Sequence, residues 1–223
     1  MRPTWFLLAL AVLAAGCAPR LDAQAVGPDA RPSARALGAT ADSLASATLP
    51  RRPGAVRRAL ARAGATPLAD GGRGARWTAP DGGSPDVLAA AFVPGRDPLA
   101  RSELVVLSAD LDGPAAAAVL EAVRVLVERS TWRTAPERSV EVVLWRGAPP
   151  DPARAPLWTR ANVRAVLVVG RPAPGLADIG AEALPADGDS VALAQRIVDR
   201  VTELARRPAR PASAPSPDSP TAR

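Results

Sequence analysis

In the middle of the chain, short apolar runs typical of buried strands stand on either side of a segment with helical spacing of its charged residues. Residues 103–109 form a short, mostly apolar run that ends at the turn-like sequence 110–114, which predicts a buried strand. Over 115–129 the charged positions gather on one side at helical spacing, which predicts a helix packed on a sheet. The apolar run 140–145 predicts a second strand. These three elements most simply form a parallel, right-handed βαβ unit, whose ligands would lie at the carboxyl ends of the strands, here 110–114 and 146–151.

The segments on either side of this unit continue the alternation of helices and strands. Helices are expected at 34–48 and 53–63, strands at 86–93 and 163–169, and a last helix from the N-cap signal at 187–190 to Leu204. The pattern predicts an α/β fold, a three-layer α/β/α sandwich with a mixed, mainly parallel sheet. One domain spanning 34–207 is the expected folded unit, because 223 residues give one full core with tails.

The amino-terminal residues read as an export signal. A positively charged start precedes an apolar run, 5–15, that is too short to span a bilayer. The run closes on small residues before Cys17, and 13–17 resembles the lipobox of bacterial lipoproteins, although Ala14 stands where Leu is usual. The resemblance implies that 1–17 is a lipoprotein signal peptide and that Cys17 carries the lipid. The alternative is an ordinary signal peptide with an unrelated Cys.

The segments next to the predicted domain have the composition of flexible chain. Residues 18–33 contain few large apolar side chains and several prolines, so we expect a flexible tether between lipid and domain. Residues 208–223 are rich in Pro, Ala and Ser, so we expect a disordered tail. The expected location is the bacterial cell envelope, with the domain facing the periplasm or lying on the outer surface.

Charge and residue usage remove several classes of function. All 28 basic residues are Arg, aromatic residues make up 3% of the chain, and the net charge of +6 is spread along it, so nucleic-acid binding is not expected. The chain has no His, which removes the commonest metal ligand and general base at neutral pH. Cys17 is the only Cys, so no internal disulfide can form.

The order of these segments resembles the family 28 metallopeptidases, a group of zinc aminopeptidases. The likeness is carried by a strand with a Pro-Gly turn, the strand of the first metal motif, the approach to a Glu-Glu pair and a later strand ending in Gly, at 87–97, 103–112, 136–148 and 165–170. Upstream of these stretches, residues 44–70 are similar to the entry helices of the family. The resemblance implies a truncated zinc-aminopeptidase-like fold and, in members that keep the ligands, a di-zinc peptidase site.

This chain departs from the family at the positions that carry the chemistry. Asp110 stands where the first zinc-binding His belongs, and Asp112 matches the supporting Asp of the same motif. Pro149 and Pro150 replace the Glu-Glu pair of base and ligand, and Leu167 takes the place of a further Asp ligand. A co-catalytic zinc site needs His and carboxylate ligands together with a base. We therefore expect no catalytic residues, no bound metal and no cofactor; zinc would be the cofactor only if the family site were functional.

Two hypotheses about function remain open at this point. The first is a catalytically inactive, lipid-anchored binding or scaffold module, which contacts the membrane through its lipid and takes a peptide or protein partner. The alternative is an active metal-dependent aminopeptidase with an atypical site or one completed by a partner chain. Asp110 and Asp112 are expected either to bind turn amides and free helix N–H groups or to form a residual oxygen-ligand cation site.

Overall fold

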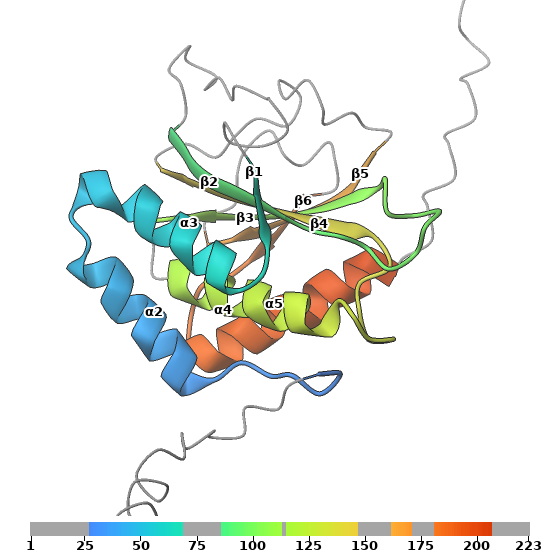
Figure 1. Ribbon diagram of the computed structural model, residues 1–223, viewed down its shortest axis with the longest axis horizontal. Coiled ribbons are helices and arrows are strands. Elements are labelled where there is room, and N and C mark those ends of the chain that lie inside the picture. The colour runs from blue at the N-terminus through green and yellow to red at the C-terminus, as the bar shows by residue number, and fades with distance from the viewer. Residues whose placement is uncertain (1–26, 69–85, 113–114, 147–161, 171–180, 207–223) are drawn as a thin grey trace, which may run out of the picture.

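The computed structural model describes residues 27–68, 86–112, 115–146, 162–170 and 181–206 of the chain (Figure 1). In chain order the elements are α2 (Ala34–Ser46), η1 (Leu49–Arg51), α3 (Arg52–Arg62), β1 (Thr66–Leu68), β2 (Asp86–Val93), β3 (Leu104–Asp110), α4 (Ala116–Arg129), β4 (Ser139–Arg146), β5 (Val163–Val169), β6 (Ala181–Leu184) and α5 (Ser190–Arg206). Each predicted helix and strand is present within a few residues of its expected bounds.

The strands form one mixed sheet in the order β1-β2-β4-β3-β5-β6. Strand β3 runs parallel to both β4 and β5, and β5 runs parallel to β6, whereas β1 and β2 are antiparallel to their neighbours. In the β3–β4 pair Leu104 lies opposite Ser139 and Asp110 lies opposite Trp145. The predicted βαβ unit and the α/β fold with a mixed, mainly parallel sheet are therefore confirmed.

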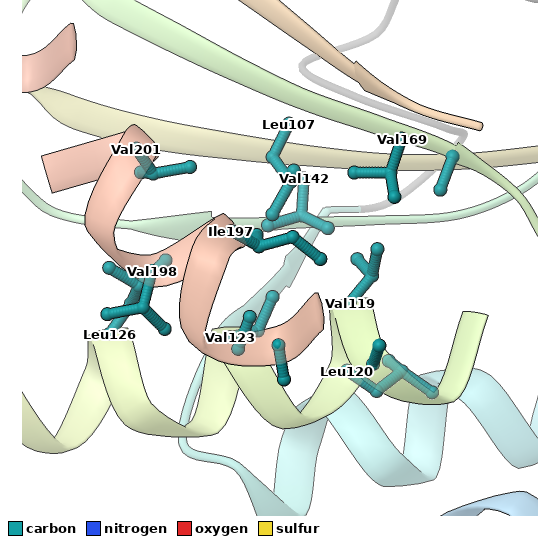
Figure 2. Close-up of a cluster of buried hydrophobic side chains, with 14 of the residues drawn as sticks. Leu107, Val119, Leu120, Val123, Leu126, Val142, Val169, Ile197, Val198 and Val201 are labelled. Atoms are coloured by element: carbon teal, nitrogen blue, oxygen red, sulfur yellow. The ribbon is translucent and has the colours of Figure 1, made fainter. Parts of the chain in front are cut away.

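The described helices cover one face of the sheet, with α4 and α5 against its centre (Figure 1). Their apolar side chains and those of the strands form one core, in which Leu107 and Val142 of the sheet meet Ile197 of α5 (Figure 2). The stripe on α4 is unusually wide, because Ala116–Val123 are all buried. Small Ala side chains let α4 approach the sheet and α5 closely, so this helix is the central packing element of the layer.

The opposite face of the sheet carries a second apolar cluster. It consists of Leu104, Val106, Val143, Trp145, Val163, Val166 and Val168. A polar contact on this face joins two neighbouring strands: Trp145 Nε1 donates to Ser108 Oγ over 2.8 Å, and both side chains are buried. Alternation along β3 thus separates the two faces, with Val105, Leu107 and Ala109 on the helix side.

Two short strands were missed in the sequence pattern, and both lie at edges of the sheet. The segment Thr66–Leu68 contains Pro67, which an edge strand tolerates because one side of the strand needs no ladder hydrogen bond. The segment Ala181–Leu184 has neither β-branched nor aromatic residues and only four positions, so it gives no recognisable period. Backbone pairing with β5, and not side-chain pattern, makes it a strand.

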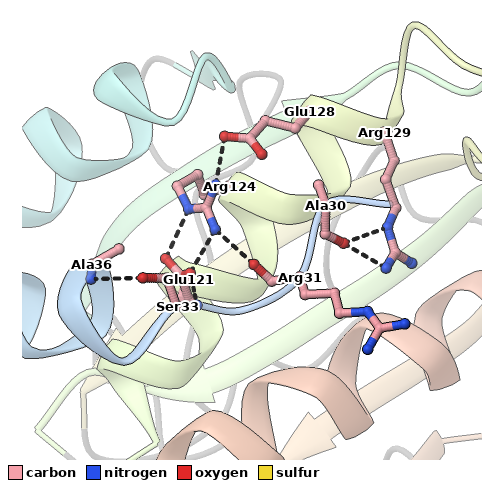
Figure 3. A network of polar contacts seen from close by, with 8 residues as sticks. All are labelled: Ala30, Arg31, Ser33, Ala36, Glu121, Arg124, Glu128 and Arg129. Atoms are coloured by element: carbon pink, nitrogen blue, oxygen red, sulfur yellow. Dashed lines mark hydrogen bonds and ion pairs between the residues drawn. The ribbon is translucent and has the colours of Figure 1, made fainter. Parts of the chain in front are cut away.

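The expected flexible tether over 18–33 is wrong for the part that the structure describes. Residues 27–33 pack along α4, and Ala30 is fully buried. Arg129 donates to the Ala30 carbonyl from Nε (3.0 Å) and Nη2 (2.6 Å), and Arg124 Nη2 donates to the Arg31 carbonyl (3.0 Å; Figure 3). The prediction of flexibility rested on the lack of large apolar side chains, but this segment is held through hydrogen bonds to its backbone carbonyls.

Several sequence-based expectations fall outside the described residues. They are the signal peptide with Cys17, the tether up to residue 26, and the tail over 208–223. Among the described residues, no helix is both long enough and apolar enough to cross a membrane.

Candidate functional site

The candidate site lies at the carboxyl edge of the sheet, the edge at which β3 and β4 end. Asp110 is the last residue of β3, Asp112 follows in the turn, and Arg146 is the last residue of β4. The parallel register brings the ends of these strands level, because Asp110 lies opposite Trp145. Leu111 N donates to the Trp145 carbonyl over 2.8 Å and continues the ladder into the turn. The sequence-predicted pair Asp110 and Asp112 is thus at the edge where the fold places ligands.

Asp112 is held by two guanidinium groups from different parts of the chain. Arg52, at the start of α3, donates from Nη1 to Oδ1 over 2.7 Å. Arg146 donates from Nε to Oδ2 over 2.5 Å. Partial burial alone would raise the pKa of Asp112, but the hydrogen bonds from Arg146 and Arg52 hold it below its usual value. Both carboxylate oxygens are engaged, and the three side chains form a surface cluster with an excess of positive charge.

Asp110 serves the turn itself. Its Oδ1 accepts the backbone N–H of Asp112 over 3.0 Å, the arrangement by which Asp commonly closes a turn two residues on. Among the described residues, no hydrogen bond joins Asp112 to an N–H group of the following helix, the second of the two structural roles expected for this pair. Asp112 joins α3 to the end of β4 instead.

The remaining positions of the expected zinc site do not join this cluster. Leu167 is fully buried in the core on the helix side of the sheet. It pairs with Leu107, three residues before Asp110, and alternation along β3 places Asp110 on the other face. Pro149 and Pro150 lie outside the described residues. Within the described ranges, no group of three or more His, Cys, Asp or Glu side chains could hold a metal ion.

These residues do not fit a zinc ion. Zinc sites in proteins need three or four nitrogen, sulfur or carboxylate ligands that converge on one point. Here one carboxylate is paired with two arginines, the other closes a turn, and the third position is an aliphatic side chain in the core. Two guanidinium charges beside Asp112 also oppose the approach of a divalent cation.

Arg146 was expected at this edge as the end of the second predicted strand, whereas Arg52 was not expected here. The chain has 28 basic residues, and no spacing distinguishes these two from the others. The only available signal was position, since each lies at an end of an element that the fold brings to the same edge.

A second polar network lies at the opposite, amino edge, the edge at which β3, β4 and β5 begin. Glu103 binds Arg164 and also Arg138, whose Nε lies 2.5 Å from Oε2. The hydrogen bond from Arg164 outweighs burial and, with Arg138, lowers the pKa of Glu103. Arg138 is buried and also donates to the Ala205 carbonyl at the end of α5 (3.0 Å), so this network ties α5 to the sheet.

An open groove of about 320 Å³ lies beside this edge, between the ends of α4 and α5. Its lining contains two cations, two acids and two hydroxyls: Arg129, Arg206, Asp199, Glu203, Thr134 and Thr202. Burial is the main reason why the pKa of Arg129 is lowered, with Arg31 and Arg206 adding to the effect. The groove has no convergent set of nucleophile and base.

Comparisons with known proteins give partial structural likeness only. No protein-family model matches the sequence, and no curated sequence matches it. A protein of Bacteroides vulgatus described as a Zn-dependent exopeptidase is 15% identical, with a TM-score of 0.40 over 60% of this chain and 57% of its own. Glutaminyl cyclase of Porphyromonas gingivalis is 13% identical, with a TM-score of 0.39 over 75% of this chain and 80% of its own.

The LapA aminopeptidase of Legionella pneumophila is 12% identical, with a TM-score of 0.29 over 60% of this chain and 35% of its own. This chain therefore spans little more than half the length of the exopeptidase and about a third of that of LapA. Identities and scores at this level do not place the chain in a family.

Proposed function

We propose that this protein is a lipid-anchored, non-catalytic binding or scaffold module of the bacterial cell envelope, with a fold that resembles zinc aminopeptidases. The observation that carries the proposal is the state of Asp112. Both of its carboxylate oxygens accept hydrogen bonds from arginine, at 2.7 Å from Arg52 and 2.5 Å from Arg146. A carboxylate in that position stabilises the joint between α3 and β4, and a metal ion would have to compete with two guanidinium groups for its oxygens.

The chemistry of the edge supports a binding role over hydrolysis. A metallopeptidase needs a metal-bound water whose pKa is brought towards ~7 and a carboxylate base that takes its proton. Asp110, the other acid of this turn, accepts the Asp112 amide N–H. The arginine-rich cluster instead presents donors that suit carboxylates, such as acidic side chains or a chain terminus of a peptide or protein partner.

The anchoring part of the proposal rests on the sequence of residues 1–17. Cys17 follows an apolar run and small residues, and no other Cys is present. The membrane is then contacted through the amino-terminal lipid, and a peptide or protein is the expected partner of the domain. The spread of the Arg residues and the low aromatic content argue against nucleic acid.

Catalytic silence is tested with protein purified without a His tag. We expect no cleavage of aminoacyl-anilide substrates above the blank, with or without added zinc, cobalt or manganese. Asp110→Ala is the matched variant, and mock-purified material is the control. Metal-dependent turnover that disappears in Asp110→Ala and is absent from the mock sample would contradict the proposal and favour the active peptidase.

Anchoring is tested separately by cell fractionation. Replacing Cys17 by Ser should move the protein from the membrane fraction to the soluble fraction, because the lipid is attached through the Cys thiol. Wild type and the variant are compared after detergent-free washes. Retention of the Cys17→Ser variant with the membranes would show that the anchor lies elsewhere.

A further inference from the structure

The docked amino-terminal segment fixes where the chain enters the domain. Helix α4 leaves the carboxyl end of β3 and returns to the amino end of β4, so its last turn lies at the amino edge. Residues 27–33 run along α4 from that end: Thr134 Oγ1 donates to the Pro28 carbonyl (3.4 Å), and Arg129 donates to Ala30. Nearer the middle of α4, the Ser33 N–H donates to Glu121 Oε1 over 2.7 Å. The chain therefore arrives at the amino edge.

The distance from the lipid-bearing residue to this edge is limited by covalent geometry. A chain from Cys17 to Gly27 spans at most ~36 Å when fully extended. A folded unit of this size has a radius of gyration of about 16 Å and hence a diameter of roughly 40 Å. The carboxyl edge is separated from the amino edge by the ~21 Å length of α4, so more than half of the chain's extended reach would be used before that edge could approach the same membrane.

The surface around the point of arrival has the side chains of a membrane interface. The indole of Trp132 lies on Gly27, whose added Cβ would be 3.4 Å from the ring, and its other side leaves the residue 49% exposed. Arg31, Arg133 and Arg206, on the segments that meet at this edge, are exposed, and so is Asp29. Tryptophan and arginine at the same surface are typical of groups that rest among lipid headgroups, where an apolar ring and a charged tip are both satisfied.

The nearby groove contains both positively and negatively charged side chains. Its lining combines Arg129 of α4 with Asp199, Glu203 and Arg206 of α5. A zwitterionic headgroup carries a phosphate and an ammonium, so such a mixture of cations and acids is complementary to it. A purely anionic partner would meet the two acids, which favours a mixed bilayer surface as the occupant.

We propose that the amino edge, made of Trp132, Arg31, Arg133 and the groove beside Arg206, rests on the lipid surface, so that the carboxyl edge with the Arg52–Asp112–Arg146 cluster faces away from the membrane. This orientation rests on the proposed lipidation of Cys17. The docked segment, the exposed Trp132 and the arginines around it support this orientation, which leaves the candidate binding cluster facing a partner in the aqueous compartment.

The test supplies the anchor chemically. The chain from Cys17 to Arg223 keeps every described residue and contains one thiol, which is coupled to a maleimide lipid in phosphatidylethanolamine/phosphatidylglycerol vesicles. Lipids with a nitroxide on the headgroup then quench any tryptophan at the surface. The fluorescence of Trp132 is obtained by subtracting the signal of Trp132→Phe from that of the wild type. We expect this difference to be clearly smaller in vesicles with the nitroxide lipid than in vesicles without it.

The matched control places an indole at the other edge. Arg51 is exposed and precedes Arg52, so Arg51→Trp in the Trp132→Phe background reports on the carboxyl edge. We expect its difference signal to stay unchanged by the nitroxide lipid. Equal quenching at both positions, stronger quenching at position 51, or none at Trp132 would overturn the orientation. Because the lipid is coupled in vitro, these results do not depend on lipidation in the cell, which the Cys17→Ser fractionation tests.

Discussion

Replacing Glu121 by Ala should destabilise the domain more than any other single substitution at the contact between α4 and residues 27–33. The Glu121 side chain is 2% exposed. Its Oε1 accepts from the Ser33 N–H and from Arg124 Nη2, each over 2.7 Å, and its Oε2 accepts from Arg124 Nε over 2.9 Å (Figure 3). The substitution leaves the Ser33 amide and one side of the Arg124 guanidinium without acceptors.

The expected loss follows from burial. Removing one partner of a buried ion pair costs ~3–5 kcal/mol, and one unsatisfied buried donor costs ~1–3 kcal/mol. Arg124 is 17% exposed and keeps its contacts with Glu128 and the Arg31 carbonyl, which reduces the cost. We therefore expect Glu121→Ala to lower the free energy of unfolding by ~2–3 kcal/mol, or the Tm by roughly 5–10 °C for a domain of this size.

Glu128→Ala is the matched control on the same helix. Glu128 also binds Arg124, but it is 25% exposed and its Oε2 is buried without a hydrogen-bond partner, so its loss should cost no more than ~0.5 kcal/mol. Urea unfolding gives both values, and hydrogen exchange of the Ser33 amide reports release of the segment. Equal losses of unfolding free energy in the two variants, or an unchanged exchange rate of the Ser33 amide in Glu121→Ala, would refute the claim that Glu121 holds residues 27–33 on α4.

Two further predictions concern the backbone and the pH dependence of stability. At Gly95 a Cβ would lie 2.5 Å from the Glu137 carbonyl oxygen, whereas at Gly38 in α2 it would meet nothing. Chemical unfolding should show Gly95→Ala losing roughly 1–3 kcal/mol and Gly38→Ala gaining ~0.5–1. Arg164 helps to lower the pKa of Glu103 from its usual 4.5, so its stabilisation is present above pH 4.5 and lost as pH falls through the lowered value. The difference in unfolding free energy between wild type and Glu103→Gln should therefore shrink on acidification, and a constant difference would contradict this assignment.

The fold was predictable from the sequence wherever burial imposed a period. Strand β3 is mostly apolar because its side chains are buried on both faces from Leu104 to Ala109, and α4 shows its charges on one side only. The short strand β6 has no such requirement, so only its pairing with β5 defines it. The docking of residues 27–33 was also invisible, because carbonyl oxygens are present at every residue and carry no sequence signal.

The candidate site was predictable in place but not in composition. Asp110 and Asp112 follow a buried strand, which located the edge. The partners of Asp112 come from residues 60 positions before it and 34 after it, and no periodicity relates them. Long-range pairing of charged side chains depends on the folded topology, so a chain with 28 Arg residues leaves the choice of partners open.

The zinc content of purified, tag-free protein tests the central claim most directly. If Asp112 forms its ion pairs with Arg52 and Arg146 and binds no metal, elemental analysis after dialysis against zinc will find much less than one zinc ion per chain. The same low value is expected for Asp112→Asn, which keeps the shape of the side chain but not its charge. One or two tightly held zinc ions per wild-type chain that are lost in Asp112→Asn would contradict the account.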